Sequence, residues 1–337
     1  MKNKLHFFLL GILILCFMVA YMGCNKDERT ITGPNSSVPT YSVTITVLGP
    51  TGVPQGGVTL TLQNPPYVSP IFTTITDSLG RGTIQVPSGN QTIIATIGTV
   101  FQVTVNVTVT STPIVISTPI QLVQNTTLGK TLVIYADCEN IETVLADTNI
   151  GYTKFDHTTV YDMRTQVDQD SVALLNYLKQ YVIVFSDCNC GDEYEYPKLA
   201  RLYGRYVQQG GKIYGGHYNY MNLQYIFAPS YNDNSQVYGS GSQLKIVNTN
   251  LSTALGYTVI DWPSSWYTQF SEIPVGNSTV YAVIDGSTGS PSSPLGIPII
   301  VENRLGAGKY VWTTYHNQDI LGDPRLIRIV RYFLYNM

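Results

Sequence analysis

A histidine stands where an α/β enzyme usually carries its nucleophile. His217 follows a short apolar run, residues 212–214, and the tight turn Gly215-Gly216. A strand that ends in a sharp turn bearing a reactive side chain is the usual arrangement of an α/β active site. Because neither serine nor cysteine follows this turn, attack by an alkoxide or a thiolate from this position is not expected.

Other polar side chains are predicted to reach the same region, since ligands of open α/β sheets bind outside the carboxyl ends of the strands. They follow predicted strands at Asp137, Cys138, Asp187, Cys188, Cys190 and His316. His217, His316 and Asp187 are the catalytic candidates. A histidine acting as general base would have to lie within hydrogen-bonding reach of Asp187 or Asp137. Each histidine could instead bond a loop carbonyl.

Three cysteines lie in the body of the chain, and their pairing is open. A disulfide from Cys138 to Cys188, or to Cys190, is one interpretation, because the strands before them are expected to be neighbours. A zinc site that adds His217 to these cysteines is a second, although Cys-x-Cys is tighter than common zinc spacings. Free thiols, or a thiolate beside His217, are the third. No cofactor is expected, and zinc is the alternative.

Aromatic residues crowd the segment after the turn, which suggests a surface that stacks on carbohydrate. Tyrosines and tryptophans recur from Tyr214 to Tyr267, interspersed with asparagine and glutamine. The ligand-binding candidates are Asp137, Tyr218, Asn219, Tyr220 and Asn317. The alternative is that these rings pack in the core and at interfaces.

The second half of the chain alternates strand and helix patterns, which predicts a mostly parallel, flavodoxin-like sheet. The expected strands are residues 131–136, 153–155, 181–185, 212–214, 257–260 and 280–284, with a hairpin pairing 298–302 and 309–314 through a turn at 303–308. The expected helices are residues 142–149, 171–179, 197–208 and 323–335. Residues 222–266 are otherwise predicted to be less regular.

Residues 41–124 alternate apolar and polar side chains in short runs, which predicts an all-β sandwich of the transthyretin or immunoglobulin type. The expected strands begin with Val43, Val58, Thr74, Thr83, Thr92 and Phe101. Asp77 could be read as a metal ligand, but an aspartate that caps its own turn is the favoured interpretation. Residues 124–130 are expected to form a hinge to the α/β domain.

The N-terminus has the pattern of an export signal. Lys2 and Lys4 precede an apolar run, residues 5–20, and Gly23-Cys24 follows. This resembles a bacterial lipoprotein signal peptide, residues 1–23, cut before Cys24. The resemblance implies a diacylglycerol and palmitate on the Cys24 thiol, and a membrane anchor. An uncleaved apolar anchor is the alternative. Residues 24–40 then form a polar tether.

Two further resemblances concern the domains. Gly52-Val53-Pro54, Thr76-Asp77-Ser78-Leu79-Gly80 and Pro87-Ser88-Gly89 resemble the carboxypeptidase-regulatory-like family, which implies a spacer or adhesive β-sandwich over residues 41–124. The stretches 210–217 and 306–316 resemble the class I glutamine amidotransferase-like superfamily, nearest its trehalose-utilisation-like branch, over residues 128–337. That family's usual cysteine is replaced by His217, so the resemblance implies the fold rather than glutaminase chemistry.

Composition limits the function. The 337 residues carry a net charge of −3, with 12% charged residues and no basic patch, which argues against nucleic-acid binding. We therefore predict an exported, lipid-anchored protein of the bacterial cell envelope, at the outer membrane or cell surface. Its amidotransferase-like domain is expected to bind a carbohydrate or an envelope protein without catalysis. The alternative is a hydrolase of a sugar-like substrate that uses His217 and His316.

Overall fold

The structure is a computed structural model that describes most of the chain after residue 37. The described residues are 38–127, 129–135, 139–155, 171–187, 196–216, 220–227, 233–238, 243–261, 266–270, 278–284, 297–317 and 322–337. Residues 40–337 form one compact unit.

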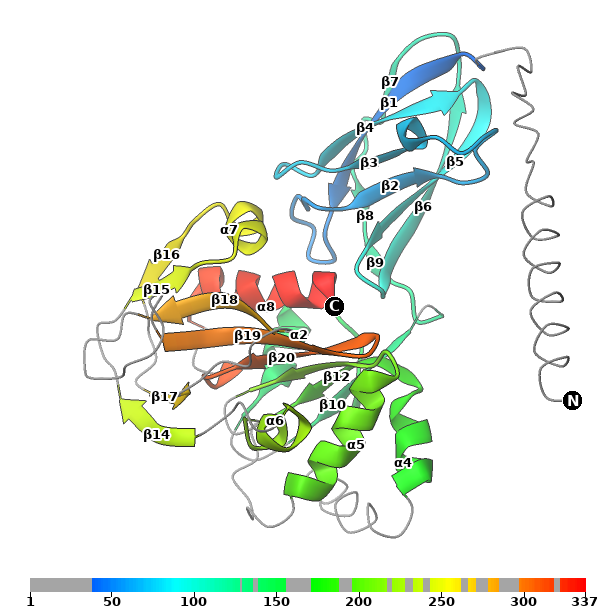
Figure 1. Ribbon diagram of the computed structural model, residues 1–337. Helices are drawn as coiled ribbons and strands as arrows, with labels where there is room; N and C mark the ends of the chain where they lie inside the picture. Colours follow the sequence, from blue (N-terminus) through cyan, green and yellow to red (C-terminus); the bar gives the residue numbers. More distant parts are fainter. Residues whose placement is uncertain are drawn as a thin grey trace, which may run out of the picture. The chain divides into compact units, whose positions relative to one another are not determined.

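A nine-stranded sheet, in the order β11-β10-β12-β13-β20-β19-β18-β15-β16, is the centre of the second half of the chain (Figure 1). Its first five strands are parallel to one another, and its last four add antiparallel pairs. The strands are β10 (Lys130–Ile134), β11 (Thr153–Phe155), β12 (Tyr181–Ser186), β13 (Lys212–Gly215), β15 (Gln243–Ile246), β16 (Val259–Asp261), β18 (Ser278–Ile284), β19 (Ile297–Leu305) and β20 (Gly308–Thr313).

The order β11-β10-β12-β13 places the first and third strands of the domain side by side, as expected for a flavodoxin-like sheet. The sequence-based strands at residues 153–155, 181–185 and 212–214 agree with β11, β12 and β13 to within a residue. The antiparallel half makes the sheet mixed rather than mostly parallel.

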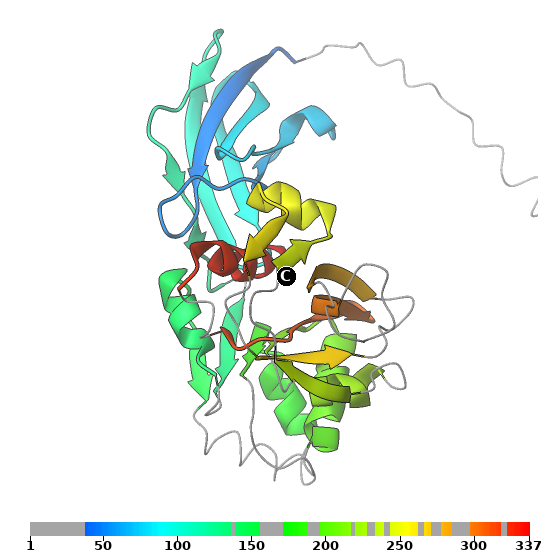
Figure 2. The ribbon, with the colours of Figure 1, turned by 90° about the vertical axis from the view of Figure 1, so that its left-hand side faces the viewer.

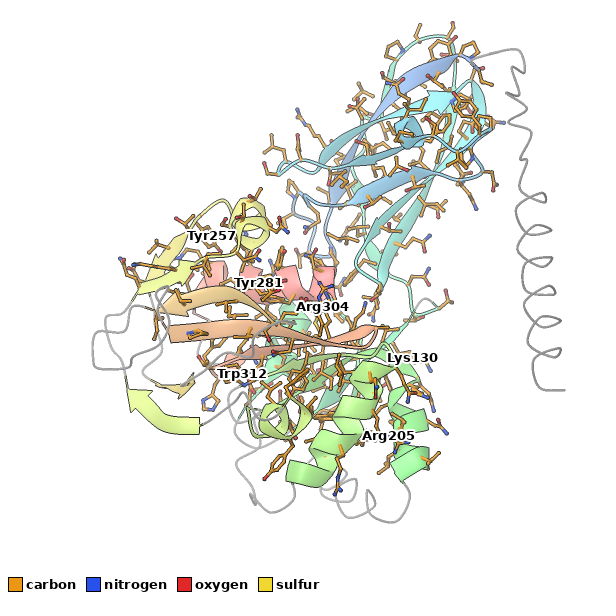
Figure 3. The ribbon with its side chains drawn as sticks, viewed as in Figure 1. Lys130, Arg205, Tyr257, Tyr281, Arg304 and Trp312 are labelled. Carbon is orange, nitrogen blue, oxygen red and sulfur yellow. The ribbon has the colours of Figure 1, made fainter. Side chains whose placement is uncertain are left out.

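Helices cover both faces of this sheet (Figures 1 and 2). They are α2 (Ile141–Asp147), α4 (Ser171–Leu178), α5 (Tyr196–Gln208), α6 (Tyr220–Phe227), α7 (Thr249–Leu255) and α8 (Pro324–Asn336). Side chains alternate along a strand, so Tyr214 joins the core beneath α2 and α8, whereas Ile213 joins the core beneath α4 and α5. Tyr281 of β18, which is labelled in Figure 3, packs edge to face on Phe333 of α8, and the two ring centroids are 4.8 Å apart.

The hairpin that joins β19 and β20 turns at Gly306 and Ala307, a shorter turn than the expected span 303–308. Gly306 has a φ of +60°. A Cβ at Gly308 would lie 2.1 Å from the carbonyl oxygen of Val207, at the end of α5. The hairpin turn thus packs so closely on that helix that Gly308 can carry no side chain.

The segment predicted to be less regular contains or borders five regular elements in addition to β16, which matches the expected strand at residues 257–260. Besides α6, β15 and α7, the structure places β14 (Asp233–Tyr238) against β17 (Trp266–Phe270) in a separate antiparallel pair. The expectation for residues 222–266 was wrong there. The helix α7 carries signals that are visible in the sequence: Asn248 caps its first turn, and Gly256 ends it with a φ of +80°.

Residues 38–127 form two further sheets, ordered β4-β1-β7, with β8 also on β1, and β3-β2-β5-β6-β9. Their strands are β1 (Thr40–Leu48), β2 (Thr59–Leu62), β3 (Thr73–Ile75), β4 (Arg81–Pro87), β5 (Gly89–Ile97), β6 (Phe101–Val109), β7 (Ile114–Val115), β8 (Ile120–Gln121) and β9 (Val123–Gln124), with the short helix η1 (Pro70–Phe72) before β3. Val43, Ile45, Leu60 and Ile93 are fully buried between them. Asp77 caps its turn, with Oδ1 accepting from Leu79 N and Arg81 N at 2.9 Å each.

The predicted leader, residues 1–23, and Cys24 lie outside the described residues. Within the part of the chain that the structure describes, none of the helices has the length and hydropathy needed to span a bilayer.

Candidate functional site

The carboxyl ends of four parallel strands bring distant polar residues together. Glu139 follows β10, Asp187 follows β12, Gly216 follows β13 and Asn317 follows β20. Glu139, Asp187 and Asn317 are all buried, with 3% or less of each residue exposed. Burial of polar side chains is costly unless they are hydrogen-bonded, so their partners define the site.

Glu139 is held by Asn317. One carboxylate oxygen, Oε1, accepts from the backbone N of Asn317 at 2.7 Å and also from its side-chain Nδ2. The other end of the amide, Oδ1, accepts from the hydroxyl of Tyr214 at 3.0 Å. Asn317 therefore links the segment after β10 to β13 through a chain of hydrogen bonds. The bonds to Glu139 and from Tyr214 together fix the orientation of its side-chain amide.

The Glu139 carboxylate also lies directly against Gly216, the second glycine of the turn. A Cβ at Gly216 would lie 2.1 Å from Oε2 and 2.5 Å from the carboxyl carbon. Glycine is thus required at this position by the close approach of the carboxylate. The carboxylate of Glu139 therefore packs directly on the backbone of Gly216.

Tyr214 and Tyr315 complete the buried environment of the acid. Burial is the main cause that raises the pKa of both phenols above the ordinary value, and the neighbouring Glu139 charge raises them further. Both therefore remain neutral and can donate hydrogen bonds at physiological pH. Tyr214 is 1% exposed, so it offers no ring face to a ligand, contrary to a role in carbohydrate stacking.

Asp187, a predicted catalytic residue, faces the start of α2. Its Oδ1 accepts from the backbone N of Ile141 at 3.4 Å, and its own N donates to the carbonyl oxygen of Ile134 at 3.0 Å. The first amides of a helix attract a carboxylate, so this position joins β12 to the element after β10. The structure brings Asp187 to the same side of the sheet as Glu139 and Asn317, at the carboxyl ends of the parallel strands.

The remaining predicted residues are only partly within the described structure. His316 directly follows the bend after β20 and is partly buried next to Asn317. Tyr220 is the first residue of α6. Asp137, Cys138, Cys188, Cys190, His217, Tyr218 and Asn219 lie outside the described residues, so the disulfide, zinc and thiolate interpretations remain predictions. Among the described residues, no group of three metal-binding side chains occurs.

Glu139 is the functional candidate that sequence reasoning missed. Its position a few residues after a buried strand was a usable signal, but Asp137 and Cys138 also follow that strand in the sequence. The distinguishing feature, contact with Asn317, joins residues 178 positions apart in sequence. The sequence identified Asn317 as a ligand candidate, and the structure shows its amide occupied by Glu139 and Tyr214.

Together these features define an α/β protein with a polar, buried network at the carboxyl edge of its parallel strands. No protein-family model matches the chain, and no curated protein is similar to it.

Solved structures give matches of low identity. One is a cytoplasmic protein from Salmonella typhimurium LT2, with 15% identity over 61% of this chain and 96% of that one, and a TM-score of 0.40. Another is a glutamine amidotransferase from Thermotoga maritima, with 13% identity over 61% and 84% and a TM-score of 0.35. A β-galactosidase from Rahnella sp. R3 matches at 12% identity over 61% of this chain, 31% of its own length, and a TM-score of 0.35.

Proposed function

We propose that this chain is an exported protein, anchored to the bacterial cell envelope by lipid on Cys24, whose α/β domain binds a carbohydrate without catalysis. Residues 41–124 act as a carboxypeptidase-regulatory-like spacer between the tether and residues 128–337, the amidotransferase-like domain. An envelope protein in place of a carbohydrate is the other ligand class compatible with this proposal.

The observation that carries a non-catalytic role is the position of Glu139. The Glu139 carboxylate lies directly against the turn, 2.1 Å from where a Cβ of Gly216 would be, so this acid contacts the backbone of the turn itself. Two donors of Asn317 hold the acid in place. An acid held by two protein donors serves to fix the turn, which supports binding over chemistry.

The carbohydrate class is supported by the residues that follow the turn. Tyr218, Asn219 and Tyr220 combine ring faces with amide and hydroxyl groups, the side chains that bind neutral sugars. On α6, Tyr225 is 52% exposed, so the helix presents an aromatic ring to solvent.

The test is a binding measurement with the full chain in detergent on an array of bacterial envelope polysaccharides and their oligosaccharides. Tyr218→Ala and Tyr220→Ala should each weaken binding about tenfold or more, as expected for loss of a stacking ring. Tyr152→Ala, at a 37% exposed tyrosine before β11, is the control and should bind as the parent does. Binding that all three variants retain would refute the proposed site.

The hydrolase remains the second candidate, because His316 lies at the same strand edge, adjacent to Asn317. The hydrolase alternative requires that the parent protein cleaves an oligosaccharide. It also requires that His217→Ala abolishes this turnover without changing the midpoint of thermal unfolding. Release of reducing ends by the parent, and its loss in His217→Ala, would replace the binding proposal with the enzyme.

A further inference from the structure

The segment between β2 and β3 exposes apolar side chains in an unusual concentration. Tyr67 is 42% exposed, Val68 is 101% exposed and Ile71 is 41% exposed. Pro65, Pro66 and Pro70, which are also exposed, complete an apolar tip of residues 65–71, interrupted only by Ser69. Exposed apolar groups that are contiguous mark a contact surface rather than ordinary surface scatter.

The apolar tip is an ordered part of the structure. The Tyr67 ring packs on the edge of buried Phe72, with centroids 5.1 Å apart. Ser69 caps η1, its Oγ accepting from Ile71 N at 3.5 Å and its carbonyl oxygen from Phe72 N at 3.3 Å. These contacts fix Tyr67 and Ile71 in exposed positions, so a binding partner would gain apolar contact without having to order the loop.

Strand register places the apolar tip at the end of the two-sheet region where the chain enters. Thr40, the first residue of β1, pairs with Pro87, the last of β4, and β5 begins two residues later at Gly89. Leu62, which ends β2 and leads into the tip, pairs with Ile93 near that start of β5. The tip and the attachment point of the tether are therefore at one end. The turn that contains Leu79 lies at the opposite end of the two-sheet region. Arg81, which follows this turn and begins β4, pairs with Thr46 near the end of β1.

The two-sheet region that carries the apolar tip is nearly free of formal charge. No acidic or basic residue occurs in residues 38–76, and Asp77 and Arg81 are the only charged residues in 38–127. The three prolines lack backbone N–H donors, so burying the tip leaves fewer donors without partners. A tyrosine beside small apolar side chains, with uncharged polar neighbours, is suited to the headgroup region of a bilayer.

We propose that residues 65–71 are a second membrane contact, which inserts Tyr67, Val68 and Ile71 into the headgroup region of the bilayer that holds the lipid anchor. This rests on the proposed anchoring through Cys24. The tether, residues 24–40, spans at most about 60 Å and does not orient the body by itself. The added contact holds the N-terminal end of the body at the bilayer and combines with the lipid as the second of two anchoring signals.

The experiment compares two tryptophan variants of the full lipidated chain. Tyr67→Trp places a probe on the apolar tip, and Leu79→Trp places one at a 61% exposed apolar residue at the opposite end. Each is reconstituted into phosphatidylethanolamine–phosphatidylglycerol vesicles, with and without lipid brominated near the headgroup. The native tryptophans give the same background in both, and flotation of the vesicles reports anchoring separately.

Bromolipid should quench most of the emission that the Tyr67→Trp substitution adds and leave the emission added by Leu79→Trp unchanged. Val68→Asp in the Tyr67→Trp chain should reduce the quenching while the chain still floats. Equal quenching of both probes, or none, in chains that float would overturn the membrane contact and leave the lipid anchor standing. Chains that do not float would refute the anchor, and the second contact with it.

Discussion

At the scale of single residues, the contact between Glu139 and Gly216 is the most specific feature of the candidate site. Gly216→Ala should destabilise the protein by about 1–3 kcal/mol, because the new Cβ would overlap the carboxylate. Glu139→Ala should cost about 2–4 kcal/mol, since it leaves the buried donors of Asn317 without their acceptor. In the Glu139→Ala background, however, Gly216→Ala should cost far less, because the overlapping carboxylate is gone.

Urea unfolding of the four proteins in this double-mutant cycle measures the coupling. Additive effects of the two substitutions would mean that the carboxylate does not lie against Gly216 in solution, and the proposed binding role would lose the support of this contact. The contact between Glu139 and Gly216 also shows which part of the site could not be predicted from the sequence. Apolar runs predict where strands end, but which of several polar residues after them is buried depends on partners far away in the chain.

The next prediction concerns the charge of Lys212, which lies at the amino ends of the parallel strands, opposite the candidate site. Lys212 is half-buried at the start of β13, with Nζ donating to Thr99 Oγ1 at 3.3 Å. Burial and the nearby Lys309 charge lower the pKa of Lys212 to about 8. Between pH 8 and its ordinary value of 10.5, the unfolded chain binds more protons than the folded one, so this group makes stability rise with pH in that window.

Lys212→Met should therefore be more stable than the parent at pH 7, by less than about 1 kcal/mol because part of the side chain stays solvated. The advantage should shrink at pH 10, where the parent's folded state no longer carries this charge. The midpoints of urea unfolding at both pH values measure this difference in stability. Lys179→Met, at an exposed lysine, is the control. An advantage independent of pH would assign the effect to packing instead of charge.

At the scale of elements, α8 shows a sequence signal that worked. Asp323 followed by Pro324 predicts a helix start, and in the structure Asp323 Oδ1 accepts from Arg325 N at 2.8 Å. Asp323→Ala should cost about 1 kcal/mol through loss of the cap, and Asp323→Asn, which can still cap, should cost less. Thermal unfolding measures both, and equal losses would show that the Arg325 ion pair matters more than the cap.

The same cap has a pH signature. The Arg325 guanidinium holds the pKa of Asp323 below its ordinary value of 3.8. A depressed carboxyl pKa stabilises the fold at pH values above the ordinary one, and this stabilisation is lost as the pH falls through the lower, folded value. The gap between parent and Asp323→Ala should accordingly narrow in strong acid.

Helices and strands were predictable from the sequence where a single hydrophobic pattern dominated the segment. Buried parallel strands such as β12 are continuous apolar runs, and α5 has one apolar side, so the described helices and strands within residues 130–215 were assigned correctly apart from their ends. The strands β14 and β17 were missed because they pair only with each other, in a segment that mixes tyrosine, asparagine and glycine. Their pairing, rather than their composition, makes them strands.

At the scale of the whole described unit, residues of the two-sheet region and the α/β domain share one buried core. Phe101 of β6 packs on Tyr335 of α8, with ring centroids 5.2 Å apart, and Gln124 bonds Gly151 through both its Oε1 and its Nε2. Gly98, with a φ of +59°, lies so close that a Cβ would be 2.4 Å from the carbonyl oxygen of Tyr335. Contacts of this kind predict that the two parts unfold together.

Gly98→Ala tests that coupling, and Gly52→Ala is its matched control. Both positions have positive φ, so each alanine should cost about 1 kcal/mol in backbone strain, but nothing lies within 4 Å of a Cβ at Gly52. Gly98→Ala should add about 1–3 kcal/mol through its clash with α8. All three tryptophans lie in residues 262–312, so their emission reports unfolding of the α/β domain alone. The tryptophan-monitored midpoint should fall further for Gly98→Ala than for Gly52→Ala. A midpoint that neither variant moves would mean that the two parts unfold independently.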